Sequence, residues 1–175
     1  ERVLAILGPT ASGKSAVAMR LARMTGAEVV SCDSMQVYRG LDIGTAKPSR
    51  QDRALVPHHL IDCADVGERY DASRFVQEAS EALTSIWGRG RLAILVGGTG
   101  LYARSLLYGV RLRPAVHEMS RQVQEEAGSA EGAEALKLEL RASDPERLVP
   151  VETYNNPRRL IRAVEVLRLT GAPPR

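Results

Sequence analysis

The stretch Gly8-Pro9-Thr10-Ala11-Ser12-Gly13-Lys14-Ser15 decides how this chain folds. It fits the pattern G-x-x-x-x-G-K-[ST], with an apolar run before it and a helical pattern after it. Glycines in this pattern let successive backbone N–H groups surround a phosphate, and the following helix directs its positive end at the same anion. Lys14 adds a charge, and the Ser15 hydroxyl is placed to bind Mg²⁺. The sequence therefore predicts a di- or triphosphate site; a glycine turn that merely joins strand to helix is the alternative. The predicted site comprises Gly8, Thr10, Ala11, Ser12, Gly13, Lys14 and Ser15.

Strand and helix patterns alternate outward from this loop. Short apolar runs predict strands at residues 3–7, 28–31 and 92–96, and helical periodicity predicts helices at residues 15–24, 72–87 and 101–107. This order indicates an α/β fold of the P-loop nucleoside-triphosphate-hydrolase type, a parallel sheet with helices on both faces. We expect residues 3–7 to form a centrally buried strand. Residues 40–70 lack clear periodicity, and a stretch of that length is usually functional.

The character of the sequence changes after Gly109. The following residues are rich in charge, and weaker helical patterns cover residues 116–127, 133–141 and 157–169. We expect a boundary between residues 109 and 114, with an α/β core over residues 1–112 and a helical part over residues 113–175.

Composition limits the class of protein. The chain has 175 residues, of which 44% are hydrophobic and 4% aromatic, so it can build an aliphatic core. No apolar run approaches the ~20 residues of a membrane span, and the start does not resemble a signal peptide. Cys32 and Cys63 lack zinc-site spacing, so we expect reduced thiols in a cytoplasmic protein with no membrane association. A net charge of +3 does not by itself indicate a nucleic-acid partner, and nothing requires more than a monomer.

Asp33 is the acidic residue best placed to act beside the phosphate loop. It follows the strand at residues 28–31, whereas the strand at residues 92–96 ends in Gly97-Gly98 instead of the metal-binding acid usual in P-loop nucleotidases. Asp33 is a candidate metal ligand, a candidate general base and a candidate cap of the following turn. The turn Gly97-Gly98-Thr99-Gly100 is suited to an anion, although such turns are often only tight connections.

Two further polar patterns have a simple structural interpretation. His58 and His59 are adjacent and point in different directions, so we expect structural polar contacts in place of a metal pair. Arg158, Arg159 and Arg162 share one face of the last helix, which is either a solvated surface or a contact to a phosphate backbone.

Five segments taken together resemble the bacterial tRNA dimethylallyltransferases, also called tRNA isopentenyltransferases. They are GPTASGKS (8–15), SCDSMQVYRGLDIGTAKP (31–48), VPHHLID (56–62), VGGTGLY (96–102) and NPRRLIRAVEV (156–166). They cover nearly the whole chain in the family's order, and the segment at residues 31–48 is the most specific.

The resemblance implies transfer of a dimethylallyl group from dimethylallyl diphosphate to N6 of the adenosine beside the tRNA anticodon, with Mg²⁺. The phosphate loop would hold the prenyl diphosphate in place of ATP. Asp33 resembles the family's general base, Thr10 a residue that contacts the same amine, and Thr99 one that contacts the diphosphate. Lys14 would stabilise charge on the leaving group, which makes Asp33, Thr10 and Lys14 the expected catalytic residues. The residues that match tRNA-contacting segments are Asp33, Ser34, Met35, Gln36, Thr99, Arg158, Arg159, Leu160, Ile161 and Arg162.

The chain departs from the family at its end. Family members continue beyond the equivalent of Arg175 with a helical part that carries an arginine near the diphosphate, so we expect this chain to be a truncation. Residues 113–175 resemble the start of the family's helical tRNA-clasping insertion. The alternatives are an adenylate isopentenyltransferase acting on free AMP or ATP, a P-loop small-molecule kinase, and a non-catalytic tRNA-binding fragment. The turn at residues 99–102 and the arginine helix argue against the first.

Overall fold

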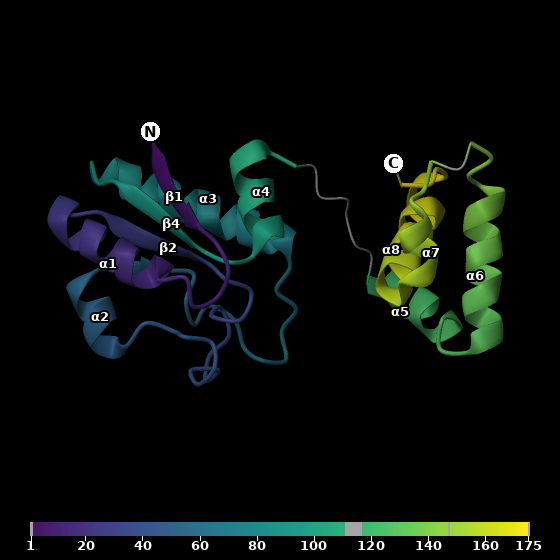
Figure 1. Ribbon diagram of the computed structural model, residues 1–175, viewed down its shortest axis with the longest axis horizontal. Coiled ribbons are helices and arrows are strands. Elements are labelled where there is room, and N and C mark those ends of the chain that lie inside the picture. The colour runs from purple at the N-terminus through teal and green to yellow at the C-terminus, as the bar shows by residue number, and fades with distance from the viewer. Residues whose placement is uncertain (1, 111–116, 147, 175) are drawn as a thin grey trace. The chain divides into compact units, whose positions relative to one another are not determined.

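The computed structural model describes residues 2–110, 117–146 and 148–174. It divides into two compact units, Glu1–Leu112 and Arg113–Arg175, of which the first is α/β and the second helical (Figure 1). Most of the boundary expected at residues 109–114 lies outside the described residues. Within the described residues, no helix has both the length and the apolar character that crossing a membrane requires.

A four-stranded parallel sheet forms the centre of the first unit. Its strands are β1 (Val3–Leu7), β2 (Glu28–Cys32), β3 (His58–His59) and β4 (Ala93–Gly97), in the spatial order β1-β4-β2-β3. Strand β4 pairs with β1 up to Leu7↔Gly97 and with β2 up to Cys32↔Gly97. The carboxyl ends of these three strands therefore lie at one edge of the sheet, where ligands of open α/β sheets bind.

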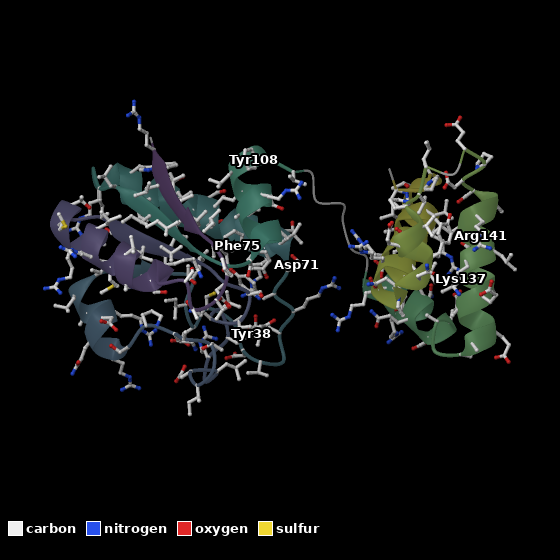
Figure 2. The ribbon with its side chains drawn as sticks, in the orientation of Figure 1. Tyr38, Asp71, Phe75, Tyr108, Lys137 and Arg141 are labelled. Atoms are coloured by element: carbon white, nitrogen blue, oxygen red, sulfur yellow. The ribbon has the colours of Figure 1, made fainter. Side chains whose placement is uncertain are left out.

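Helices cover both faces of this sheet. The helices are α1 (Lys14–Thr25), α2 (Arg50–Leu55), α3 (Ala72–Gly88) and α4 (Gly100–Tyr108). Because successive strand residues point to opposite faces, Leu95 of β4 packs in one cluster with Phe75 of α3, and Ile94 packs in another with Ala18 of α1. Figure 2 labels Phe75. Phe75 also stacks on Tyr102 of α4, with 4.5 Å between ring centroids. The predicted α/β class with helices on both faces is confirmed.

Strand β1 has the predicted residues but not the predicted environment. It lies at the edge of the sheet beside β4 alone, with Leu4 52% and Leu7 45% exposed. The expectation of a centrally buried strand is therefore wrong for the described structure. An apolar run predicts a strand, but it does not predict how many other strands lie beside it.

The segment at residues 40–70 contains two short elements that periodicity did not indicate. Helix α2 begins with a capping box, in which the Ser49 side chain accepts from Asp52 N–H and the Asp52 carboxylate accepts from Ser49 N–H. Strand β3 has only two residues and pairs with β2 at Val29↔His58. Elements this short contain too few residues for a hydrophobic period to be read.

The second unit is a cluster of four helices among its described residues. These are α5 (His117–Glu126), α6 (Ala130–Ala142), α7 (Val151–Asn155) and α8 (Pro157–Thr170), of which α7 was not predicted. Leu136, Leu140 and Val164 form part of its core. Helix α8 begins where the Asn156 side chain accepts from Arg159 N–H, with proline in its first turn, and ends at Gly171 in the left-handed conformation. It is the central element, since α5, α6 and α7 all pack against it.

Candidate active site

The phosphate loop joins β1 to α1 in a conformation suited to an anion. Ala11 and Gly13 both adopt positive φ, 63° and 80° respectively. Left-handed residues of this kind produce concave arrangements of backbone N–H groups, and an alanine that bears this strain is typical of functional sites. Helix α1 starts at Lys14 with no side chain capping its N-terminus and no acidic residue in its first turn. Its first N–H groups and its positive dipole end therefore point at the loop without an internal anion to neutralise them.

The Lys14 side chain folds back over the same loop. Its amine donates to the Pro9 carbonyl at 2.6 Å, and it lies 3.5 Å from the Ser12 hydroxyl. The neighbouring Ser15 hydroxyl is exposed and has no hydrogen-bond partner among the described residues. Both side chains that sequence reasoning assigned to the phosphate and to Mg²⁺ are thus at the loop.

A pocket of about 370 Å³ opens beside the loop. Residues 10–15 line its polar side, together with Asp33 and Gln36. The remainder is largely apolar, and its lining includes Ala18, Met19, Val29, Ile61 and Val96. The pocket thus combines an anion-binding loop, a carboxylate and an apolar recess between α1 and the sheet.

The two oxygens of the Asp33 carboxylate differ in their contacts within residues 2–110. Oδ1 accepts hydrogen bonds from Met35 N–H at 2.8 Å and from Gln36 N–H at 3.3 Å, so Asp33 does cap the turn that follows β2. Oδ2 has no hydrogen-bond partner within residues 2–110. The capping contact therefore orients the carboxylate while its second oxygen stays available to a ligand in the pocket.

Gln36 forms part of the pocket wall, and its amide is held by protein groups. Its Nε2 donates to the carbonyls of Thr45 at 2.9 Å and Ala46 at 3.2 Å, and its Oε1 accepts from the Ser31 hydroxyl at 3.0 Å. Thr45, Ala46 and Pro48 also line the pocket. Sequence reasoning included these residues in the specific segment at residues 31–48 but gave them no individual role.

Thr99 contacts the Asp33 segment and does not line the pocket. Its Oγ1 accepts from Ser34 N–H at 3.0 Å, and its own N–H donates to the Cys32 carbonyl at 3.2 Å. Gly97 and Gly98 line the pocket at this turn instead. Ser34 and Met35 also lie outside the pocket lining, and Met35 is about half exposed. The structure therefore brings Thr10, Lys14, Asp33 and Gln36 together and places Thr99 behind them.

The two histidines make structural polar contacts, as expected. His59 Nε2 lies 2.7 Å from Oε2 of Glu28, a buried carboxylate that Arg89 also binds. His58 Nδ1 lies 2.7 Å from the Val56 carbonyl, and burial lowers the pKa of His58. His58 also lines the pocket, which sequence reasoning missed. No group of three or more His, Cys, Asp or Glu side chains in the described residues is arranged to hold a metal ion.

Helix α8 of the second unit displays two of the three arginines that were expected to share a face. Arg158 and Arg159 are exposed, whereas Arg162 is half-buried and donates to Glu165 at 2.8 Å. Leu160 is only 3% exposed and Ile161 packs against the same core. These two residues therefore pack into the core of the second unit. The predicted tRNA contact of Leu160 is not available, because almost none of its surface is exposed.

Comparison with known proteins identifies the family of this chain. A model of the family described as IPP transferase matches residues 36–175, and one described as isopentenyl transferase matches residues 1–57. A tRNA dimethylallyltransferase of Halorhodospira halophila is 51% identical over 171 residues, which cover 98% of this chain and 55% of the relative. That of Geobacter metallireducens is 48% identical over 175 residues, with the same coverage of 98% and 55%. The chain thus spans about half the length of the curated relatives it matches.

Solved structures have the same fold. The full-length tRNA isopentenylpyrophosphate transferase of Bacillus halodurans matches with a TM-score of 0.63 and 42% identity, over 99% of this chain and 57% of that one. A eukaryotic dimethylallyltransferase that acts on tRNA matches with a TM-score of 0.76 and 30% identity, over 99% of this chain and 43% of that one. With a family model matching most of its length and the phosphate loop in place, the chain belongs to the IPP transferase family.

Proposed function

We propose that this protein transfers a dimethylallyl group from dimethylallyl diphosphate to N6 of the adenosine adjacent to the anticodon in tRNA. One observation carries the proposal: the phosphate loop, Asp33 and an apolar recess line the same pocket. Membership of the family and the names of the relatives support the choice of substrates. The proposal concerns the whole enzyme. This chain spans about half the length of the relatives that it matches.

The two parts of the pocket match the two parts of dimethylallyl diphosphate. The diphosphate would lie on the N–H groups of residues 10–15 and near the Lys14 amine, which carries the opposite charge. The five-carbon group would lie against apolar side chains such as Met19, Ile61 and Val96. An apolar wall suits a five-carbon chain better than it suits the polar ribose of a nucleoside triphosphate.

The reaction can be written with the residues at hand. The adenosine N6 attacks the allylic carbon, the bond from that carbon to the diphosphate oxygen breaks, and the diphosphate leaves with the electron pair. The proton of the amine passes to Asp33 Oδ2, the carboxylate oxygen without a partner in residues 2–110. Thr10 lies in the same lining and would hydrogen-bond the amine. Lys14 and the loop N–H groups stabilise the charge that develops on the leaving group, a contribution of several kcal/mol in comparable sites.

Mg²⁺ would be held at Ser15. The hydroxyl is exposed at the first turn of α1 and has no partner among the described residues, which fits an ion bound by one protein oxygen, substrate phosphate oxygens and water. Such an ion neutralises diphosphate charge when it is bound.

Transfer RNA would be bound by residues beside the pocket and by helix α8. The segment at residues 33–36 adjoins the carboxylate, and Arg158 and Arg159 expose two positive charges that suit a phosphate backbone. Extrusion of one base from its stack costs a few kcal/mol, and less in a loop than in a duplex. We place this chemistry in the cytoplasm and in a monomer.

Transfer of labelled dimethylallyl tests the proposal directly. The 175-residue chain and a longer natural chain containing it are each incubated with labelled dimethylallyl diphosphate, Mg²⁺, and either unmodified tRNA or free AMP. We expect label in tRNA only. Label in AMP would assign the protein to the adenylate isopentenyltransferases, and phosphoryl transfer from ATP would assign it to the kinases. Label with the longer chain alone would show that residues 1–175 do not complete turnover by themselves.

A further inference from the structure

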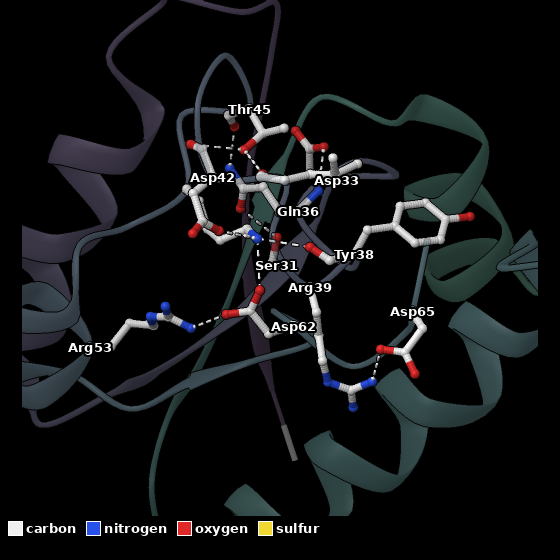
Figure 3. A network of polar contacts seen from close by, with 12 residues as sticks. Ser31, Asp33, Gln36, Tyr38, Arg39, Asp42, Thr45, Arg53, Asp62 and Asp65 are labelled. Atoms are coloured by element: carbon white, nitrogen blue, oxygen red, sulfur yellow. Dashed lines mark hydrogen bonds and ion pairs between the residues drawn. The ribbon is translucent and has the colours of Figure 1, made fainter. Parts of the chain in front are cut away.

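A buried lysine lies at the centre of the loop that follows Asp33. The Lys47 side chain is only 2% exposed, and its amine donates to the Tyr38 carbonyl at 2.8 Å, Asp42 Oδ1 at 2.7 Å and Asp62 Oδ1 at 2.7 Å. Figure 3 labels the three acceptor residues. All three N–H groups of the ammonium are therefore satisfied by protein atoms. A charge this well buried persists only when its partners are this complete, because its desolvation costs several kcal/mol.

One of these contacts fixes the turn at residues 42–46. The Lys47 amine holds Asp42, and the Thr45 hydroxyl donates to the Leu41 carbonyl at 2.7 Å. Two residues of this turn, Gly44 and Ala46, adopt positive φ of 82° and 50°. The turn presents the carbonyls of Thr45 and Ala46 to the Gln36 side chain, so its shape determines where that amide lies.

A second contact fixes the backbone of Gln36 from the other side. Asp62 N–H donates to the Gln36 carbonyl at 3.2 Å, and the Asp62 carboxylate binds both Lys47 and Arg53. Burial raises the pKa of Asp62, but the hydrogen bonds from these two cations outweigh that and hold its pKa below the ordinary value. Asp62 is therefore a carboxylate at neutral pH and keeps Lys47 charged.

Gln36 is in turn a direct neighbour of the proposed base. Its own N–H donates to Asp33 Oδ1, the same oxygen that Met35 N–H binds. A continuous set of contacts thus runs from the Lys47 amine through the 42–46 turn and Asp62 to Gln36, and from there to the Asp33 carboxylate. None of these contacts includes the phosphate loop.

We propose that Lys47 is a positioning residue for the reaction: it fixes Gln36, and through Gln36 it orients the Asp33 carboxylate, without touching either substrate. This role rests on the proposed function. It separates two tasks of the pocket, because the diphosphate would be held by residues 10–15, which share no hydrogen bond or ion pair with the Lys47 network within residues 2–110. Loss of Lys47 should therefore impair the chemical step and leave binding of the prenyl diphosphate unchanged.

Hydrogen exchange measured on the 175-residue chain tests the structural half of this proposal without any activity. In Lys47→Met we expect the N–H groups of Met35 and Gln36 to exchange about tenfold faster, because the turn that Asp33 caps loosens. The N–H groups of α1 should keep their protection. Unchanged exchange at Met35 and Gln36, or an equal acceleration throughout α1, would overturn the proposal.

Kinetics on the full natural chain test the functional half. We expect Lys47→Met to lower kcat by about 10- to 100-fold while KM for dimethylallyl diphosphate stays within about twofold. Arg39→Gln is the matched control, because the Arg39–Asp65 ion pair lies in the same loop region but does not contact Gln36. It should leave both constants unchanged. A rise in KM for the diphosphate with kcat unchanged would contradict the assignment.

A milder variant covers the case in which Lys47→Met does not fold. Asp42→Ala removes only the contact to the turn, from a side chain that is 67% exposed, and leaves Lys47 bound to Asp62. It should accelerate exchange at Gln36 and lower kcat in the same direction by a smaller factor. If the wild-type enzyme transfers no prenyl group, the proposed function fails, whereas the exchange measurement still decides whether Lys47 orients Asp33.

Discussion

Gly97 and Cys32 approach so closely that a β carbon on Gly97 would lie 1.9 Å from the Cys32 carbonyl oxygen. The two residues are partners in the pairing of β4 with β2, immediately before the turn that carries Thr99 and the segment that carries Asp33. The absence of a side chain at this position thus lets the ends of the two strands meet beside the pocket.

Gly97→Ala should destabilise the fold, because the clash is with backbone atoms that cannot rotate away. We expect a loss of about 1–3 kcal/mol in the free energy of unfolding, measured by urea denaturation. Gly88→Ala is the control, since a β carbon at Gly88 in α3 meets nothing within 4 Å. That substitution should cause no loss and a gain of up to about 1 kcal/mol. Equal stability of the two variants would show that β4 and β2 can move apart at Gly97 with no loss in the free energy of unfolding.

Asp33→Asn should separate the two roles of this carboxylate. The amide oxygen can still accept from Met35 and Gln36 N–H, so the turn and the thermal midpoint should be preserved. The base is lost, and we expect prenyl transfer to fall by about 10²–10⁴-fold with diphosphate binding retained.

The Asp33→Ala variant provides the comparison for the cap. It removes both roles, so it should lose the same activity and in addition about 1 kcal/mol of stability. Loss of Mg²⁺ affinity in the Asn variant would indicate a metal ligand instead of a base.

Glu28 should make the stability of the chain fall in acid. Burial raises its pKa, but hydrogen bonds from Arg89 and His59 outweigh this and hold the pKa below the ordinary value of 4.5. Because the folded-state pKa is depressed, this stabilisation is present above about pH 4.5 and is lost as the pH falls through the folded-state value. Urea midpoints measured from pH 7 to pH 3 should fall less steeply in Glu28→Gln than in the wild-type chain.

Arg158 and Arg159 should contribute electrostatically to tRNA binding. In the double variant Arg158→Gln/Arg159→Gln, affinity for tRNA should weaken, and the slope of log affinity against log salt should decrease by roughly 1 to 2. Arg121→Gln is the control, because Arg121 is also exposed in the second unit but is paired with Glu118. A salt slope identical to that of the wild-type would show that these two arginines are ordinary solvated surface residues that do not contact tRNA.

The elements that could be predicted are those whose sequence pattern is long or chemically specific. The long helix α3 has its apolar residues at helical spacing, and the phosphate loop has eight positions in register, so both were expected close to where they lie. Strand β1 shows the limit, because its residues were predicted but its position at the sheet edge depends on neighbours far away in the chain.

The candidate site divides in the same way. Asp33 was singled out by its place after a strand. That its Oδ1 caps the turn, while its Oδ2 has no hydrogen-bond partner within residues 2–110, is visible only in the structure. The bond from Ser34 N–H to the Thr99 hydroxyl spans 65 positions in sequence, and no local pattern reports such a contact. The contacts of Lys47 could not be predicted from the sequence either, because an isolated lysine in a loop is expected to be solvated unless its burial is known.

The resting contact of Lys14 has a consequence for affinity. One of the three N–H groups of its amine donates to the Pro9 carbonyl at 2.6 Å, so an arriving anion that uses this N–H competes with a ligand that the protein supplies itself. The affinity of the loop for a diphosphate therefore includes the loss of this contact. An anion with several charges offsets that loss more readily than a singly charged one.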